Sequence, residues 1–244
     1  MTARVAAPAR ATGRQAAVGL ALASAIAGTW LALHIYSVFF HPLNGAGLAV
    51  APLLVLAITW LNVGMFIVAH DCMHGSLAPG RPGLNRNVGR VMLALYAGFS
   101  FDRLLPKHHD HHKHAGTDGD PDYSHSNRFW PWYLAFFREY FGWREFGVLA
   151  VLLWSYVLIL GASPVSALLF WGVPAILSSL QLFYFGTYLP HRRDEFDFAD
   201  RHRARSNEYG YIASLLSCYH FGYHHEHHRH PHLPWWKLPS ARTR

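Results

Sequence analysis

The segment LAVAPLLVLAITWLNVGMFIVA (48–69) and the HDCMH that follows it (70–74) decide how this chain folds. No Asp, Glu, Lys or Arg interrupts residues 48–69. A helix crosses the apolar core of a bilayer in about 20 such residues. His70 and His74, four positions apart, come directly after this run. The segment therefore predicts a membrane helix that ends beside a pair of imidazoles.

Two longer stretches, residues 15–70 and 146–191, also lack Asp, Glu, Lys and Arg. Each is long enough for two spans joined by a turn, and HPLNG (41–45) and GASP (161–164) are typical turn sequences. The chain is only 14% charged, against about 25% in soluble proteins. An all-α integral membrane protein is expected, rather than buried hairpins in a soluble bundle. Its four transmembrane helices are predicted at about 16–40, 48–69, 146–160 and 165–189.

The basic residues predict the orientation of these helices. Arg4, Arg10 and Arg14 precede the first span, and segments 70–145 and 190–244 are basic, whereas both turns lack Lys and Arg. With four spans, every basic segment lies on one side, which the positive-inside rule makes cytoplasmic. We expect one membrane domain over 1–244, with both termini and a helical cap in the cytoplasm. The net charge of +7 fits this surface, and no nucleic-acid partner is expected.

The 19 histidines are grouped in a way that predicts metal binding. Besides HDCMH, the chain contains HHDHH (108–112) and HHEHH (224–228). Residues at i, i+3 and i+4 share one face of a helix. The candidate ligands are therefore His70, His74, His108, His111, His112, His224, His227 and His228, with His191 after the last span as a ninth.

Eight or more imidazoles are too many for one ion, so two ions are implied. Imidazole suits iron, zinc, copper and nickel, and the Glu-rich motifs of soluble di-iron bundles are absent. His220, four positions before His224, is an alternative ligand. In the acidic loop, Asp118 and Asp120 are candidate catalytic carboxylates. With Asp71 and Asp122, they are also candidates for accepting the second N–H of a ligating histidine.

At these residues the chain resembles the membrane fatty-acid desaturase and hydroxylase superfamily, and within it the bacterial β-carotene 4-ketolases. The three histidine boxes are typical of the superfamily, and their flanking residues indicate the ketolases. The matching segments are HDCMHG (70–75), KHHDHHKHAGTDGDPDY (107–123), FFREYFGWRE (136–145), FGTYLPHR (185–192) and CYHFGYHHEHHRHPHLPWWKLP (218–239).

The resemblance implies a non-haem di-iron centre held by the eight box histidines and His191, in a bacterial cytoplasmic (inner) membrane. It implies O2 as cosubstrate and electrons from an external donor such as ferredoxin. The C4 methylene of a β-ionone ring would become a ketone by successive hydroxylation and dehydration. β-Carotene would give echinenone and canthaxanthin, and hydroxylated carotenoids would move towards astaxanthin.

The same reasoning predicts how partners approach. A carotenoid is expected to arrive from the bilayer between spans, past Phe183, Tyr184, Phe185 and Tyr188, although an ordinary interfacial aromatic belt explains these four equally well. Trp235 and Trp236 are expected to anchor the chain at the membrane surface. An acidic donor protein would be attracted by basic side chains, namely Lys107, Lys113, Arg128 and Arg138.

Two alternatives to a ketolase stay open on the sequence. One is a carotenoid hydroxylase or lipid desaturase of the same superfamily, because the histidine boxes are common to all of them. The other is a membrane metal transporter. It is disfavoured because transport sites lie near the bilayer midplane, whereas these histidines follow the ends of the predicted spans.

Overall fold

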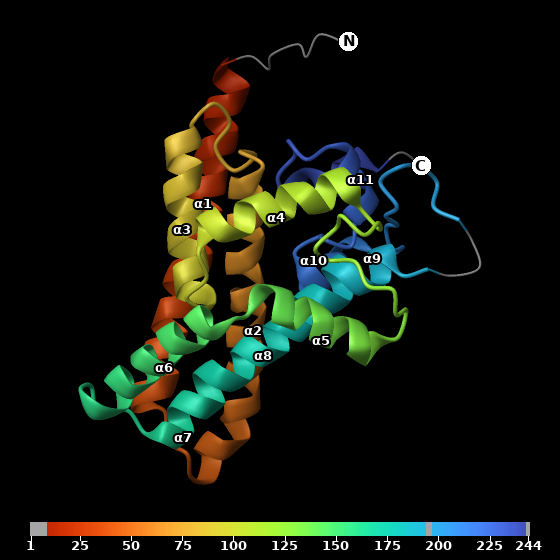
Figure 1. Cartoon of the computed structure of the whole chain (residues 1–244). Coiled ribbons are helices and arrows are strands. Elements are labelled where there is room, and N and C mark those ends of the chain that lie inside the picture. Colours follow the sequence, from red (N-terminus) through yellow and green to blue (C-terminus); the bar gives the residue numbers. More distant parts are fainter. Residues whose placement is uncertain (1–8, 194–196, 243–244) are drawn as a thin grey trace.

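The computed structural model describes residues 9–193 and 197–242, and within these ranges every regular element is a helix, with no strand (Figure 1). The first half contains α1 (Ala9–Ile35) with a π-helical extension (Tyr36–Phe40), α2 (Gly45–Met73), α3 (Pro82–Ala97), α4 (Phe101–His114), α5 (Phe129–Tyr140) and α6 (Trp143–Leu158). The second half contains α7 (Pro164–Ala167), η2 (Leu168–Gly172), α8 (Val173–Phe183), η3 (Tyr184–Tyr188), α9 (Leu189–His191), α10 (Tyr211–Cys218), α11 (His224–Arg229) and η4 (Trp235–Ala241).

Three continuous helical segments of the described chain are long and apolar enough to cross a membrane: Thr12–Phe40, Gly45–Met73 and Pro164–His191. They contain the first, second and fourth predicted spans. The third prediction, 146–160, falls on α6, which is bent by 78° from α5. Glu145 Oε2 accepts the backbone N–H of Gly142 at this bend, 3.2 Å away. The pair makes a fourth span only if both helices are taken as one broken crossing, so the structure has three or four candidate spans.

The second helix is longer than its charge-free stretch predicted. Instead of ending at residue 69, α2 continues to Met73, and His74 forms its C-cap. Asp71 does not end the helix because its carboxylate is satisfied in the interior. Its Oδ2 accepts the backbone N–H of Trp235 at 3.1 Å. His70 therefore lies in the last turn of a membrane helix rather than after it.

The same contact corrects the expectation for Trp235. This side chain is buried, with its ring centroid 5.2 Å from that of Tyr219, so it joins the C-terminal segment to the core and does not anchor the chain at a membrane surface. Trp236 is half-buried. The η4 segment thus closes over the end of α2.

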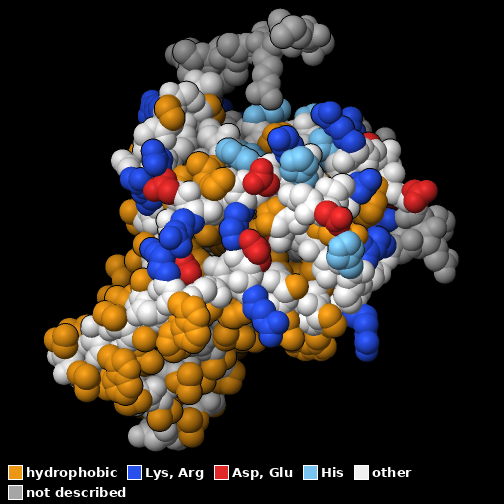
Figure 2. Space-filling model, in the orientation of Figure 1, with side chains coloured by type: hydrophobic (Ala, Val, Ile, Leu, Met, Phe, Trp, Pro, Cys, Tyr) orange, Lys and Arg blue, Asp and Glu red, His pale blue; other side chains and the backbone are white. Residues whose placement is uncertain are grey.

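α2 is the centre of the fold and packs against α1, α3 and α8. Gly98 ends α3 in the left-handed conformation (φ 67°), which glycine adopts without strain, and so allows α4 to turn away. α4 then runs across the end of the bundle towards α11 (Figure 1). On the face in Figure 2, hydrophobic side chains cover the half with α6 and α7, and Lys, Arg, Asp, Glu and His gather on the half with α4.

Candidate metal centre and substrate cavity

The crossing of α4 over the end of α2 assembles the first group of imidazoles. One ring nitrogen from each member lies within 4.8 Å of those of all the others. The five histidines of this group come from α2 with its C-cap, α4 and α11, which are far apart in sequence. The group consists of His70, His74, His108, His112 and His227.

The second group lies beside the first. It joins α4 and α11 to α9, the short helix that ends the last apolar segment. Its nitrogens also lie within 4.8 Å of one another, and all four residues are buried. The members are His111, His191, His224 and His228. The structure thus brings together all nine histidines singled out in the sequence, in two sets.

Distances within the sets match those between ligands of one ion. Nε2 of His224 lies 2.9 Å from Nε2 of His191 and 3.0 Å from Nε2 of His228. Nε2 of His227 lies 3.0 Å from Nε2 of His112. Imidazole nitrogens bound to one ion at about 2.1 Å and at right angles would lie about 3.0 Å apart. A ring nitrogen offers one N–H or one lone pair, so His224 Nε2 cannot make two good hydrogen bonds at once.

Buried nitrogens without partners point the same way. Among the described residues, both ring nitrogens of His70 and the Nδ1 atoms of His224 and His228 have no hydrogen-bond partner. A buried polar atom left unpaired costs about 1–3 kcal/mol. A bound cation would satisfy one nitrogen of His70 and the Nε2 atoms that converge in the second group, although not the Nδ1 atoms of His224 and His228, so the residues present fit a metal.

The protonation of these rings also suits a metal. Burial, reinforced by neighbouring histidines, lowers the pKa of His74, His108 and His227 well below its usual value. Burial lowers the pKa of His112 to about 2. At neutral pH these rings are uncharged and each offers a lone pair, which is the form that binds metals.

His111 differs because carboxylates of the acidic loop face its other nitrogen. Burial alone would lower the pKa of His111, but Asp122 and Asp120 outweigh it and raise the pKa. His111 Nδ1 lies 2.9 Å from Asp120 Oδ1 and 3.6 Å from Asp122 Oδ2. A carboxylate on the second nitrogen holds the tautomer and orientation of a ligating imidazole.

The two candidate catalytic carboxylates have different surroundings. Asp120 is buried and also accepts the backbone N–H groups of Gly116 and Asp122, at 2.9 and 2.8 Å. Asp118 has a side chain that is 81% exposed and lies 3.4 Å from Nε2 of His125, so the structure does not bring it to the histidine groups. Asp118 faces solvent and Asp120, only two residues later, is buried, because the loop turns between them.

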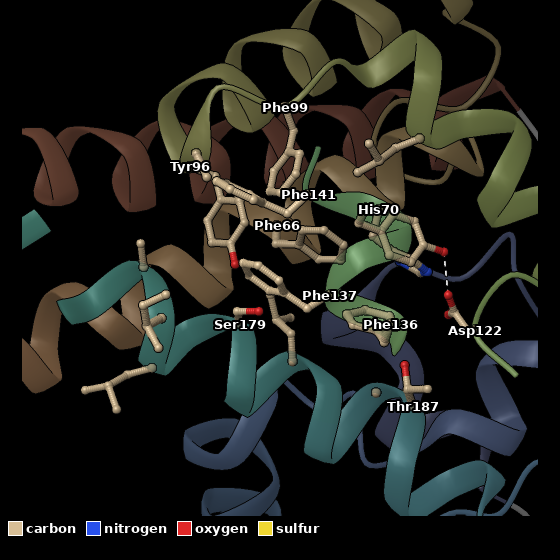
Figure 3. A pocket seen from close by; sticks show the side chains of 18 of the residues that line it. Phe66, His70, Tyr96, Phe99, Asp122, Phe136, Phe137, Phe141, Ser179 and Thr187 are labelled. Carbon is tan, nitrogen blue, oxygen red and sulfur yellow. Dashed lines mark hydrogen bonds between the residues drawn. The ribbon is translucent and has the colours of Figure 1, made fainter. Parts of the chain in front are cut away.

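Asp122, in contrast, lies closer to the site than its sequence context indicated. It lines the cavity described below and accepts a hydrogen bond from the Tyr140 hydroxyl (Figure 3). Burial raises the pKa of Asp122 to about 6, although Tyr140 and His111 oppose the shift. No sequence pattern pairs Tyr140 with the acidic loop, because they meet only through the packing of α5.

His191 and His220 also show what tertiary structure decides. Nδ1 of His191 donates to the backbone carbonyl of Arg203 at 2.7 Å, which leaves Nε2 facing the second group. His220 is buried, with its ring centroid 4.4 Å from that of Tyr211, and belongs to neither group of the described residues. The alternative ligand is therefore not placed at the site.

A cavity of about 550 Å³ leads away from the histidines. Imidazoles of both groups line it, and so do Leu149, Leu168 and Ile176, of which the last two are exposed. Besides the imidazoles, aromatic rings form a large part of the wall (Figure 3). Among the described residues they belong to Phe66, Tyr96, Phe99, Phe136, Phe137, Tyr140, Phe141 and Phe221.

These aromatics are not the ones predicted. None of Phe183, Tyr184, Phe185 and Tyr188 is among the described residues that line the cavity. Phe183 packs instead with Trp132 and Tyr133 in a separate buried cluster behind the wall. The run of aromatics from 129 to 141 was the available signal, but the face of α5 that meets the cavity depends on how that helix docks against α8.

A model of fatty acid desaturases matches residues 45–148 and 138–244, which include all three histidine boxes. The chain belongs to the fatty acid desaturase family. Within the family it belongs with the β-carotene ketolases. It is 51% identical over 231 residues to the β-carotene ketolase of Paracoccus sp. (strain PC1), with 92% of both chains covered. It is 50% identical over 234 residues to the β-carotene ketolase of Paracoccus sp. (strain N81106 / MBIC 01143), with 93% of both covered.

Two less similar members of the family differ in how much of this chain they match. The chain is 35% identical over 237 residues to a zeaxanthin 4-ketolase of Chlamydomonas reinhardtii. The aligned region covers 92% of this chain and 53% of the algal protein. The chain is 37% identical to an sn-1 oleoyl-lipid 12-desaturase of Anabaena variabilis, but only over 87 residues, which are 33% of the chain. The extended likeness is therefore to ketolases, and the lipid desaturase shares only a part. The two imidazole groups are compatible with the non-haem iron site of this superfamily.

Proposed function

We propose that this chain is a membrane-bound β-carotene ketolase, an O2-dependent oxidoreductase that converts the C4 methylene of a β-ionone ring to a ketone. One observation carries the proposal. Imidazoles of two groups, with six of the nine rings buried, line an aromatic-rich cavity whose lining also includes the exposed apolar side chains of Leu168 and Ile176. A long hydrocarbon with a ring at its tip fits such a site.

Each imidazole group would hold one iron ion. The donor set is composed of imidazole nitrogens, a type of ligand that suits iron. His70, His74, His108, His112 and His227 would bind the first ion, and His111, His191, His224 and His228 the second. When bound, the ions would supply the activation of O2. Asp120 would hold His111 in position, and the backbone carbonyl of Arg203 would hold His191.

The cavity would bind one ring of the substrate with part of its polyene. Burial of apolar surface contributes about 25 cal/mol per Å², and the aromatic wall would exclude water from the reacting carbon. Each oxidation replaces one C4–H bond with C4–OH. It consumes one O2, two electrons and two protons, and it releases one water. A second oxidation at the same carbon gives a gem-diol, which loses water to leave the ketone.

The distribution of charge supports an orientation for this chemistry. Basic side chains gather on the half that carries the histidines, whereas the opposite half is apolar (Figure 2). We therefore place the centre and both termini on the cytoplasmic side of a bacterial inner membrane, as one domain over 1–244. The bent pair α5–α6 would form the fourth, broken crossing, and the remaining segments the cytoplasmic cap.

The electron donor would be a ferredoxin-like protein that docks on this basic face. Of the four predicted attractors, Lys107 already lies 2.6 Å from Glu139 Oε1, so its charge is partly neutralised. Lys113, Arg128 and Arg138 are the better candidates for attracting an acidic partner. Reversal of these three charges should raise the apparent KM for the donor more than reversal of Lys107 does.

The test is expression in a bacterium that accumulates β-carotene, with wild type compared to His111→Ala. We expect the variant to stay in the membrane, to lose most of its iron and to make no ketone. His125→Ala is the matched control, because this side chain is 84% exposed and belongs to neither imidazole group.

Three outcomes would contradict the proposal. Hydroxylated carotenoid without ketone from the wild type would identify a hydroxylase, and unsaturated lipid would identify a desaturase. Metal accumulation in vesicles without any need for O2 would identify a transporter. Ketone production by His111→Ala would refute the ligand assignment.

A further inference from the structure

The cavity contains polar side chains in an otherwise apolar wall, and most of them are already paired. The Asp122 carboxylate accepts from Tyr140. The Tyr96 hydroxyl lies 3.4 Å from Ser178 Oγ, and Ser179 Oγ accepts from the Tyr133 hydroxyl at 3.2 Å.

Thr187 is the exception. It lines the cavity and is 4% exposed, and its hydroxyl, which keeps some accessible surface there, makes no hydrogen bond to any of the described residues. In Figure 3 this hydroxyl points towards the part of the cavity lined by Phe136 and Asp122. A hydroxyl without a partner inside an apolar cavity is unfavourable unless a ligand satisfies it.

The backbone around Thr187 places it near the metal groups. Thr187 lies four residues before His191, so the two side chains lie on similar faces one turn apart. Residues Tyr184–Tyr188 form the π-helical segment η3 between α8 and α9. Single π-helical turns within α-helices occur often at functional sites, because the extra residue re-aims the side chains that follow.

The proposed reaction sets a problem that such a hydroxyl can solve. The first oxidation leaves an alcohol at C4, and a ketone forms only if the same carbon is oxidised again. An alcohol without a polar contact in the cavity would leave for the bilayer as readily as the hydrocarbon entered. A hydrogen bond from the protein to the new C4–OH would hold the ring in place for the second oxidation.

We propose that Thr187 hydrogen-bonds the C4 hydroxyl of the first product and retains it for the second oxidation. The inference rests on the proposed ketolase function and extends it to a residue that determines how far oxidation proceeds. Loss of one such hydrogen bond should weaken retention of the alcohol by about 2- to 10-fold. The affinity for β-carotene itself, which has no hydroxyl, should not change.

The test compares Thr187→Val, which has nearly the same shape but no hydroxyl, with Thr187→Ser, which keeps the hydroxyl. In a β-carotene-producing host, Thr187→Val should raise the ratio of 4-hydroxy to 4-keto product about 2- to 10-fold, and Thr187→Ser should restore a ratio near that of wild type. Thr59→Val is the control. It makes the same change at a buried residue of α2 whose hydroxyl donates to the backbone carbonyl of Val55 and which does not line the cavity, so it should leave the ratio unchanged.

A second measurement does not depend on turnover. Purified protein without O2 is titrated with 4-hydroxy-β-carotene and with β-carotene, and binding is followed by quenching of tryptophan fluorescence. Thr187→Val should weaken binding of the alcohol about 2- to 10-fold, with unchanged binding of β-carotene and unchanged iron content. If Thr187→Val fails to reach the membrane, Thr187→Ala replaces it in both measurements.

The outcomes separate the two proposals. A wild type that makes no ketone refutes the ketolase function itself. Ketone from the wild type, together with an unchanged product ratio or an unchanged alcohol affinity in Thr187→Val, refutes only the role of Thr187. A ratio that rises in Thr187→Ser as much as in Thr187→Val, or that rises in Thr59→Val as well, would show a packing effect and would likewise overturn it.

Discussion

Replacement of Asp120 by Asn tests whether the acidic loop supports the metal centre. Asp120 Oδ1 faces both His111 Nδ1, at 2.9 Å, and the backbone N–H of Asp122, at 2.8 Å, while Oδ2 accepts the N–H of Gly116 at 2.9 Å. An amide has one oxygen, so Asn can keep the first two contacts or the third, and its NH2 group then faces a donor. At least one buried donor loses its partner, at a cost of about 1–3 kcal/mol.

The effect on iron follows from His111. Loss of the partner that orients a ligating histidine typically lowers metal affinity by about 10- to 100-fold, which is about 1.4–2.8 kcal/mol. We therefore expect Asp120→Asn to reach the membrane but to release iron at chelator concentrations about 10- to 100-fold lower than wild type. The assay is iron content of protein in lipid nanodiscs after equilibration with a graded series of an iron chelator.

Asp118→Asn is the matched control, because it makes the same chemical change two residues away at an exposed position. It should retain iron as wild type does. Equal chelator midpoints for the two variants would refute the assignment of Asp120 to His111. The unpaired donor should also lower the unfolding temperature of the metal-free Asp120→Asn protein, and such a loss with an unchanged chelator midpoint would show that the loop supports only the fold.

Two further predictions concern packing. Gly89→Ala should lower the free energy of unfolding by about 1–3 kcal/mol, because a Cβ there would lie 2.2 Å from the Phe101 ring and 3.1 Å from the Cβ of Cys72. Thermal unfolding in detergent measures this loss. Gly83→Ala is the control and should show no loss, because a Cβ at Gly83 would have nothing within 4 Å. The thiols of Cys72 and Cys218 are free and buried, and burial raises the pKa of Cys218. Neither should react with a maleimide in native membranes and both should react after denaturation, so labelling of the native protein would contradict the packing around α2 and α10.

Local patterns predicted the parts of the site that depend on helical spacing. The i, i+3 and i+4 spacing within the histidine boxes predicted which imidazole rings face the site, and all eight predicted histidines of the boxes lie in the two groups. His191 joined them although it stands alone in sequence. Its position directly after the last apolar stretch was the signal, since that placed it at the same membrane depth as the others.

Features that depend on how helices dock could not be predicted in this way. The cavity takes the rings of Phe136, Phe137 and Tyr140 from α5 and none of the four aromatic rings predicted between residues 183 and 188, because α5 turns an aromatic face towards α8. Asp118 and Asp120 are alike in sequence, but only Asp120 turns inward. Trp235 is buried because its backbone satisfies Asp71, a contact between residues 164 positions apart.

By itself, the amino-acid sequence determined that this chain is helical, membrane-embedded and rich in paired imidazoles, because hydropathy and helical periodicity act over a few turns of chain. Only the tertiary structure decided how nine histidines divide into groups of five and four, which carboxylate supports them and which aromatic rings enclose the cavity. These features depend on the packing of side chains from helices that are distant in sequence, and that packing is set by shape and burial across the whole core.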